Sequence, residues 1–493
     1  MENDTRITRR GALKAGTLAA GAAAVGALAD AADAAENLRR FERQSAVDPK
    51  HRILLKGGTI VSMDPKVGDL VQGDVLIEGK KIAAIAAELN PSGAQMIDAR
   101  DTILVPGFVD CHRHSWEAQL RRINPNAATL ADYSNATHLS FAKAYRPQDL
   151  YVANYLTAVG CVDSGITCVL DNSHNSRSAA HSDAAVEALF DGGIRAVHAS
   201  GAPQAGDWDH QWPQDLERLQ KKYFTSTDQL VTLRMFSGPN RDNWVLARKL
   251  GLRITTEFTG PQAAAALDTL AQDKLVGPDN TFNHCGVLPE KTWQIFVDTG
   301  ANINVCPRSD AQYALGEGIC ALQHAWDHGI KPGFSVDNET SYSTDMFSEM
   351  RVALYLQRAV AQNRRFSGDQ NPPKPLMVRD VLYCATMAGA RCAGLEDKIG
   401  SLAPGKEADL LMIRSDDINL YPSNNAIGTV VQAAERSNID TVIIGGRVRK
   451  YRGKVVGLDM KRLKTMVEES RGHLFAAIGY KPDMFAESLP KLS

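Results

Sequence analysis

The middle of the chain alternates short apolar runs with stretches that have the periodicity of amphipathic helices. Eight apolar runs follow one another in this order, and stretches of helical length such as 184–193 and 289–300 lie between them. Eight parallel strands with helical crossovers close a TIM (β/α)8 barrel, which is the α/β fold that we expect. A doubly wound open sheet is the alternative, but no GxGxxG motif follows the first strand. The expected strands are 102–110, 165–171, 194–201, 230–238, 252–258, 281–285, 301–307 and 332–337.

Two groups of shorter β runs flank this alternating region. The first extends from Arg52 to about Leu104, and a second group with the same character lies at 408–415 and 440–456. Gly and Asp interrupt the runs, which is typical of strands and hairpins. The expected domains are therefore a β unit from 52–104 plus 400–457 and a barrel from 105–399. A C-terminal helix and tail follow over 458–493, with the helix from Asp459 to about Ile478.

The amino terminus predicts an export signal over residues 1–35. Thr8–Lys14 reads TRRGALK, and an uncharged stretch rich in Ala and Gly continues to Ala29, with small residues beyond it. This pattern resembles a twin-arginine signal, so we expect the export machinery as a partner and a periplasmic or secreted product without a membrane anchor after processing. A flexible basic tail or a short membrane anchor is the alternative, although the stretch is short for a span.

Composition limits the class of partner. The chain has 493 residues, 44% of them hydrophobic and 23% charged, which is more than one compact domain usually holds. Its formal charge of −2 does not favour nucleic acid, so a small-molecule substrate is expected. The eight cysteines form no CxxC pair, which indicates buried free thiols rather than a cysteine zinc site.

The segment 105–114, VPGFVDCHRH, predicts a metal site at the end of a strand. His112 and His114 point to the same side of an extended backbone, because side chains alternate with a period of two. His284 and Asp337 also end later strands, where barrel enzymes hold their catalytic groups. Imidazole nitrogens and a carboxylate suit one divalent ion, Zn²⁺ first, with Fe²⁺ or Mn²⁺ as alternatives.

Three motifs resemble those of the amidohydrolase superfamily. The first metal motif of that superfamily, PGxxDxHxH, is matched at 106–114; 282–290 is similar to its sixth-strand histidine and 333–341 to its eighth-strand aspartate. The likeness spans Arg52 to the C-terminus and is greatest to the branch of cytosine, guanine and S-adenosylhomocysteine deaminases and s-triazine chlorohydrolases. The resemblance implies that the flanking β runs assemble into one composite β-sandwich and that the protein is a homo-oligomer.

The fifth strand departs from the pattern of that branch. Its members have a metal histidine there, followed three residues later by a glutamate that moves protons, whereas this chain has Glu257 and Gly260. In one interpretation Glu257 is a ligand, which gives two histidines and two carboxylates. In the other, Glu257 is the acid/base and His284 completes the coordination. The strand register favours the first. No lysine lies in 230–238, where binuclear relatives carry one, which favours a single metal.

The resemblance implies hydrolysis of a C–N or C–X bond by metal-activated water. Asp337 would take the proton of the water, and His284 would hydrogen-bond the group that gains negative charge. The missing glutamate favours amide hydrolysis or displacement from a triazine-like ring over purine or cytosine deamination. A metal-dependent lyase or hydratase, and a relative that binds metal or ligand without turnover, are the alternatives.

Three further residues are candidates for substrate binding. His174 follows the second strand and could touch substrate or hold a loop, and Trp116 could form a wall or pack under the rim. Asn338 follows Asp337 directly and could also orient it. The segment from Trp116 to about Tyr145 is a candidate lid, because loops at this position often cover the substrate.

Overall fold

The computed structural model describes residues 50–316 and 318–490. The export signal expected over 1–35 lies outside the described residues. Within the described ranges, no helix is long and apolar enough to cross a membrane.

Eight parallel strands form the barrel, and each pairs with its neighbour in sequence. The last strand lies near the first, where Arg113 and Asp337 form an isolated parallel bridge. The barrel is nearly closed, and the TIM-barrel fold expected from the sequence is confirmed. Its strands are β6 (Phe108–Arg113), β7 (Ile166–Ser173), β8 (Arg195–Ser200), β9 (Val231–Phe236), β10 (Ile254–Phe258), β11 (Asn280–His284), β12 (Asn302–Val305) and β13 (Gly333–Phe334).

The expected first strand, 102–110, is in fact two strands in two different sheets. β5 (Thr102–Pro106) pairs with β14 (Leu410–Arg414) outside the barrel, and β6 begins at Phe108. Gly107 lies between them, and a Cβ at this position would be 2.1 Å from the hydroxyl oxygen of Thr167. The chain therefore crosses from one sheet to the other at a residue that must lack a side chain.

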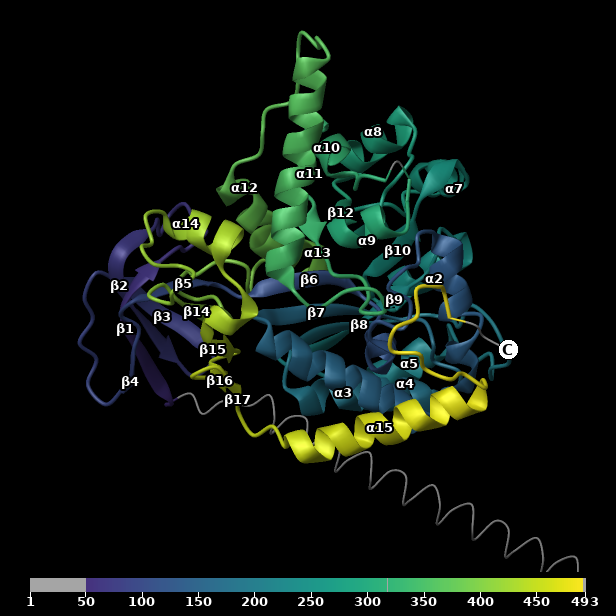
Figure 1. Ribbon diagram of the computed structural model, residues 1–493, viewed down its shortest axis with the longest axis horizontal. Coiled ribbons are helices and arrows are strands. Elements are labelled where there is room, and N and C mark those ends of the chain that lie inside the picture. The colour runs from purple at the N-terminus through teal and green to yellow at the C-terminus, as the bar shows by residue number, and fades with distance from the viewer. Residues whose placement is uncertain (1–49, 317, 491–493) are drawn as a thin grey trace, which may run out of the picture.

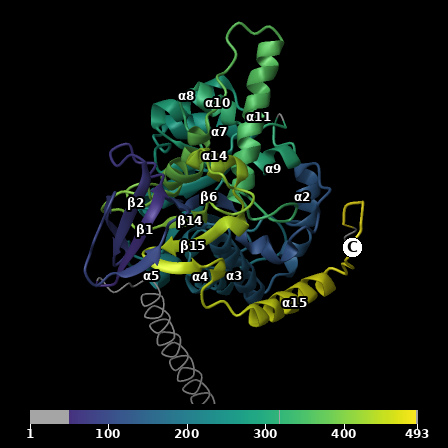
Figure 2. The ribbon, with the colours of Figure 1, turned by 60° about the vertical axis from the view of Figure 1, so that its left-hand side comes forward.

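Helices surround the barrel and connect successive strands (Figure 1). Their burial follows the expected amphipathic pattern: α4 (Ala179–Gly192) buries Val186, Leu189 and Phe190 and is capped by Gly193, which has a left-handed φ of 64°. The longest helix, α11, extends beyond the body of the barrel in both views (Figure 2). The barrel helices are α3 (Pro147–Asp163), α4 (Ala179–Gly192), α5 (Asp215–Tyr223), α6 (Arg241–Lys249), α7 (Gly260–Gln272), α8 (Glu290–Thr299), α9 (Pro307–Gln312), α10 (Leu322–Asp327), α11 (Met346–Phe366), α12 (Val378–Tyr383) and α13 (Gly389–Ala393).

A nine-stranded sheet stands beside the barrel (Figure 1). Its two halves, far apart in sequence, join where β5 and β14 run antiparallel with Leu104 opposite Met412. Arg195, at the start of β8, links this sheet to the barrel, because its guanidinium donates to Glu407 (2.6 Å) and Asp409 (2.8 Å). The other strands of the sheet are β1 (Arg52–Ile60), β2 (Leu70–Glu78), β3 (Lys81–Ala86), β4 (Gln95–Asp98), β15 (Ile439–Ile444), β16 (Arg447–Tyr451) and β17 (Lys454–Val455).

The C-terminal helix α15 (Met460–Ala477) runs along α3 on the outside of the barrel (Figures 1 and 2). Asp459 caps it by accepting a hydrogen bond from the backbone N–H of Arg462 (3.0 Å). Leu463 and Leu474 are buried, so the apolar stripe of this helix covers the barrel rather than facing solvent.

Candidate metal centre

The ends of β6 and β13 place two histidines and an aspartate side by side. Asp337 follows β13 with a left-handed φ of 70°, a conformation that is costly for a residue other than glycine. Its N–H donates to the carbonyl of His112 (2.9 Å), and its carbonyl accepts from the N–H of His114 (2.7 Å). These bonds hold the Asp337 carboxylate beside both imidazoles.

The five residues expected as metal ligands face one point at the mouth of the barrel. Asp337 Oδ1 lies 3.1 Å from the Nε2 atoms of both His112 and His114. Glu257 Oε1, from β10, lies 3.3 Å from His112 Nε2 and 3.7 Å from His114 Nε2. Its Oε2 atom lies 3.1 Å from His284 Nε2, at the end of β11. Glu257 therefore reaches both the histidine pair and His284.

The opposite nitrogen of each ring is held by a neighbour. His284 Nδ1 lies 2.7 Å from Asp310 Oδ1, and His114 Nδ1 lies 3.3 Å from the backbone oxygen of Asn172. His112 Nδ1 contacts the side-chain amide of Asn172. Since Asn172 Oδ1 has no partner among the described residues, a rotated amide would accept from Nδ1–H of His112. The rings of His114 and His284 can present an unprotonated Nε2, the arrangement that metal-bound histidines adopt, whereas His112 Nδ1 also lies 3.1 Å from Nδ2 of Asn283.

The donor atoms fit a cation. His112 Nε2, Asp337 Oδ1 and both carboxylate oxygens of Glu257 are buried and have no hydrogen-bond partner of good geometry among the described residues. Such atoms are costly when left unpaired. Donors about 2.1 Å from a tetrahedral ion lie about 3.4 Å from one another. The donor separations of 3.1 Å and 3.7 Å, between Asp337 or Glu257 and His114, bracket this value.

The two carboxylates are ionised in this setting. Burial alone would raise the pKa of Glu257, but His112 and His284 lower it to about 2. The same opposition of burial and neighbouring histidines holds the pKa of Asp337 below its usual range. Ionised carboxylates are the form that binds a metal. Cys306 is also close to His112 and His284, but burial raises the pKa of its thiol, which disfavours it as a ligand.

A cavity of about 170 Å³ opens in front of these side chains. His174 lines it, as expected, with its ring 4.3 Å from that of His114. His138, which the sequence reasoning did not single out, lies beside it, and the two ring centroids are 4.6 Å apart. Burial lowers the pKa of His138 to about 3 and lowers that of His174 as well, so both rings are neutral. The other wall residues are Leu130, Tyr133, Ser134, Gln204, Thr259, Tyr313 and Leu315.

Trp116 and Asn338 do not line the cavity, so the expected substrate contacts are absent and the second alternative holds for each: Trp116 packs under the rim and Asn338 orients Asp337. Trp116 is fully buried behind it, with ring centroids 5.4 Å from His138 and 5.8 Å from His174. Asn338 is also buried, and its Nδ2 donates to Asp337 Oδ2 (3.2 Å). Each side chain therefore lies one layer too deep to reach the cavity. Trp116 packs against His138 and His174, and Asn338 holds Asp337.

The candidate lid, from Trp116 to about Tyr145, does cover the site. It forms the short helices η1 (Ser115–Leu120), α2 (Leu130–Ala136) and η2 (Phe141–Ala144). Tyr133 of α2 donates to the carboxylate of Glu117 (2.7 Å), and both side chains are buried. This bond fastens α2 over the metal site.

Comparisons with known proteins agree with this geometry. Residues 247–449 match the family model described as "Amidohydrolase family". The 5-methylthioadenosine/S-adenosylhomocysteine deaminase of Desulforamulus reducens is 24% identical over 450 residues, which cover 86% of this chain and 99% of that protein. An adenosine deaminase from Xanthomonas campestris with bound zinc matches in structure with a TM-score of 0.75, 21% identity and coverage of 87% of this chain and 100% of that chain. The zinc complex of the atrazine chlorohydrolase TrzN from Arthrobacter aurescens has a TM-score of 0.71, 23% identity and coverage of 85% and 100%.

The fold, the converging side chains and these matches define a metal-dependent hydrolase. They support the amidohydrolase family, with deaminases and triazine hydrolases among the homologues. The enzyme class expected from the sequence, a hydrolase of C–N or C–X bonds, is confirmed at this level.

Proposed function

We propose that the chain is an exported hydrolase that uses one zinc ion to cleave a C–N or C–X bond in a small, neutral, ring-bearing molecule. The observation that carries the proposal is the convergence of three Nε2 atoms and two carboxylates on one point. His112, His114, Glu257 and Asp337 would hold the ion. Zinc is proposed because two solved structures of the same fold contain it.

When bound, a divalent ion would acidify a water molecule and polarise the substrate. Asp337 would receive the proton of that water. Its Oδ2 atom accepts hydrogen bonds from Ser309 and Asn338, which fixes the carboxylate with Oδ1 toward the histidines. With Glu257 as a ligand, His284 would not bind the ion, and Cys306 and Asp310 outweigh burial and raise its pKa. The ring would then be protonated at both nitrogens, so that Nδ1 donates to Asp310 and Nε2 donates to the atom that gains negative charge.

The walls of the cavity favour a flat, uncharged substrate. Tyr133, His138, His174 and Tyr313 contribute rings, and the two histidines are neutral. Gly260 stands where the deaminase branch has its proton-moving glutamate, and it begins α7 without a side chain. This absence favours amides and substituted heterocycles over nucleobases. Among the relatives, one is named as a deaminase and another as an atrazine chlorohydrolase. These names correspond to the loss of an amino group and of a halide.

We also propose that the protein is exported and forms a homo-oligomer. The sequence TRRGALK at Thr8–Lys14 supports transport by the twin-arginine route to the periplasm or beyond. That route carries folded proteins, so the metal would be acquired before export. Likeness to the amidohydrolase superfamily supports a homo-oligomer. Cell fractionation of the full chain and of an Arg9→Lys, Arg10→Lys variant tests the route, which predicts that only the parent leaves the cytoplasm.

The experiment that tests the function is metal content by mass spectrometry together with turnover of amides and of amino- or chloro-substituted heterocycles. The parent is expected to hold one equivalent of metal and to release amine, ammonia or halide. Glu257→Ala should hold much less metal, and the matched control Glu290→Ala, an exposed glutamate, should retain it. Equal metal in Glu257→Ala would make Glu257 the acid/base and His284 the ligand. Turnover without amine or halide release would indicate a lyase or hydratase instead.

A further inference from the structure

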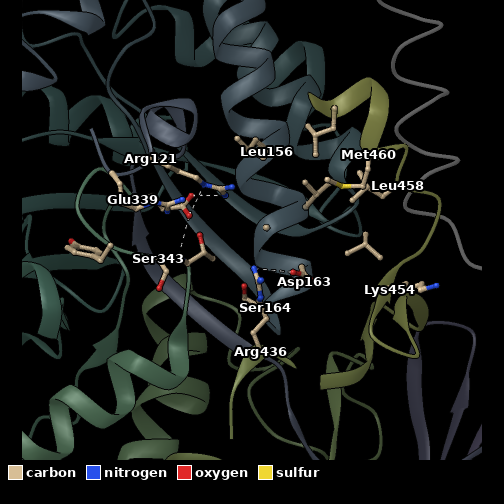
Figure 3. A pocket seen from close by; sticks show the side chains of 17 residues that line it. Arg121, Leu156, Asp163, Ser164, Glu339, Ser343, Arg436, Lys454, Leu458 and Met460 are labelled. Atoms are coloured by element: carbon tan, nitrogen blue, oxygen red, sulfur yellow. Dashed lines mark hydrogen bonds and ion pairs between the residues drawn. The ribbon is translucent and has the colours of Figure 1, made fainter. Parts of the chain in front are cut away.

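A second cavity, of about 650 Å³, lies on the outside of the barrel (Figure 3). The end of α3, the loop after β13 and the segment between β17 and α15 form its walls. None of its lining residues lines the cavity at the metal centre. A ligand here would therefore occupy a separate site, whose test does not depend on the hydrolase proposed above.

The cavity carries an excess of positive charge. Four cations and two carboxylates line it, and both carboxylates are already paired. Arg121 binds Glu339 through two contacts of 3.0 Å, and Arg436 lies 3.3 Å from Asp163. These pairs leave the other two lining cations to attract a ligand of negative charge.

Those two cations are Arg122 and Lys454. Neither has an ion-pair partner within residues 50–316 and 318–490. Burial lowers the pKa of Arg122, and the nearby carboxylate of Glu339, which Arg121 already binds, offsets this only in part. Arg122 also has a left-handed φ of 57°, a costly conformation that is concentrated at functional positions in proteins.

A buried hydroxyl and an apolar wall add to the site. Ser164 is only 1% exposed, and its Oγ has no hydrogen-bond partner among the residues that the structure describes. Leu156, Leu458 and Met460 lie on one side of the cavity, away from the Arg121–Glu339 pair (Figure 3). An adjoining groove of about 640 Å³ lies beneath α15, and the two cavities share Arg121, Arg122, Leu156, Met460 and Leu463. There is thus room for an apolar body beyond the charged end.

We propose that this cavity binds an amphipathic organic anion, in which an acidic head group is joined to an aliphatic or aryl body. The head group would lie at Arg122 and accept a hydrogen bond from the Ser164 hydroxyl, and the exposed Lys454 at the edge of the cavity would add to the positive charge. The apolar body would lie against Leu156 and Leu458 and extend toward the groove beneath α15. Charge complementarity selects the anion, and the length of the apolar wall selects its body.

Calorimetric titration of the full-length, metal-loaded protein with octanoate tests this site. Octylamine and 1-octanol serve as cationic and neutral probes of equal length. Octanoate should bind saturably and about tenfold more tightly than hexanoate, since two further methylene groups become buried. Octylamine and 1-octanol should bind far more weakly.

Variants separate this cavity from the metal centre, which could also attract a carboxylate. Arg122→Gln should weaken octanoate binding about tenfold, because a hydrogen bond to a charged group is lost. Leu458→Asn should reduce the gain from hexanoate to octanoate. Lys374→Gln, at an exposed lysine outside the cavity, is the matched control and should bind like the parent. Equal octanoate affinity in Arg122→Gln and the parent, with equal melting temperatures, would overturn the proposal, as would equal binding of 1-octanol.

Discussion

Glu257 spans the metal centre: its Oε2 atom lies 3.1 Å from His284 Nε2, while Oε1 faces His112 at 3.3 Å. The resemblance to the deaminase branch implies a histidine at this position, so Glu257 places a negative charge where a neutral ring is expected. A carboxylate makes the site more anionic and would make a bound water less acidic.

Glu257→Gln is expected to weaken metal binding by at least about tenfold, because a charged ligand becomes a neutral amide of the same size. Glu257→His should instead retain the metal, since it restores the imidazole found in relatives of the deaminase branch. Competition against a chromogenic chelator measures both affinities. The ligand role of Glu257 would be refuted by a Glu257→Gln variant that retains parental affinity.

Asp310→Asn separates the two possible roles of His284. Asp310 on α9 accepts from His284 Nδ1 at 2.7 Å, and loss of its charge removes the group that orients the ring. If His284 acts as a hydrogen-bond donor to the reacting group, kcat should fall by about 10- to 100-fold while metal content is unchanged. Steady-state kinetics and metal analysis on one preparation measure both effects. A parallel loss of metal would show instead that His284 is a ligand.

Tyr133→Phe tests the attachment of the lid helix α2. Burial raises the pKa of Glu117 to about 8, and the Tyr133 hydroxyl is its hydrogen-bond donor at 2.7 Å. Removal of this donor should lower the free energy of unfolding by about 1–2 kcal/mol. It should also raise KM, because Tyr133 lines the cavity. Chemical denaturation and kinetics provide the two readouts, and Tyr355→Phe, at a residue that is 51% exposed, should change neither.

The strand-end residues of this site could be predicted from the sequence because each lies in a short local pattern. The HxH spacing and the aspartate after the eighth apolar run need only strand periodicity to be placed at one end of a barrel. His138 and Asp310 have no such pattern. They reach the site through a loop and a short helix whose course depends on tertiary packing, so no periodicity identifies them.

Sequence periodicity also does not predict whether a side chain lines the cavity or lies behind it. Trp116 follows the histidine pair by two residues, yet the turn into η1 directs it behind the cavity rather than into it. The expected single strand 102–110 is wrong for a similar reason, since it is two strands in two sheets. An unbroken apolar run does not show that the chain leaves one sheet and enters another at Gly107.

The stability of the fold should depend on pH through Glu349 on α11. Burial, opposed by the ion pair with Arg308, raises the pKa of Glu349 from 4.5 to about 7 in the folded protein. A raised carboxyl pKa means that the folded state binds the proton more tightly. Its stabilising contribution is therefore complete below pH 4.5 and is lost as the pH rises to 7. Glu349→Gln cannot titrate, so its free energy of unfolding should fall less between pH 4.5 and pH 7 than that of the parent. Urea denaturation at several pH values gives both slopes, and identical slopes would contradict this assignment.

Gly107→Ala should destabilise the junction between the two sheets. The added Cβ would lie 2.1 Å from Thr167 Oγ1 and 2.6 Å from its Cβ, so that β5 or β7 must move. Overpacking of this kind typically costs about 1–3 kcal/mol and sometimes more. Gly238→Ala is the matched control, since nothing lies within 4 Å of a Cβ built there.

Combination with Thr167→Ala distinguishes this clash from a general effect of the added methyl group. Removal of the Thr167 hydroxyl and methyl eliminates the two shortest contacts, so Gly107→Ala should cost less in the Thr167→Ala background than in the parent. Denaturation curves of the parent, the two single variants and the double variant supply the coupling free energy. Additive effects would show that the crossing at Gly107 tolerates a side chain and that Thr167 does not restrict it.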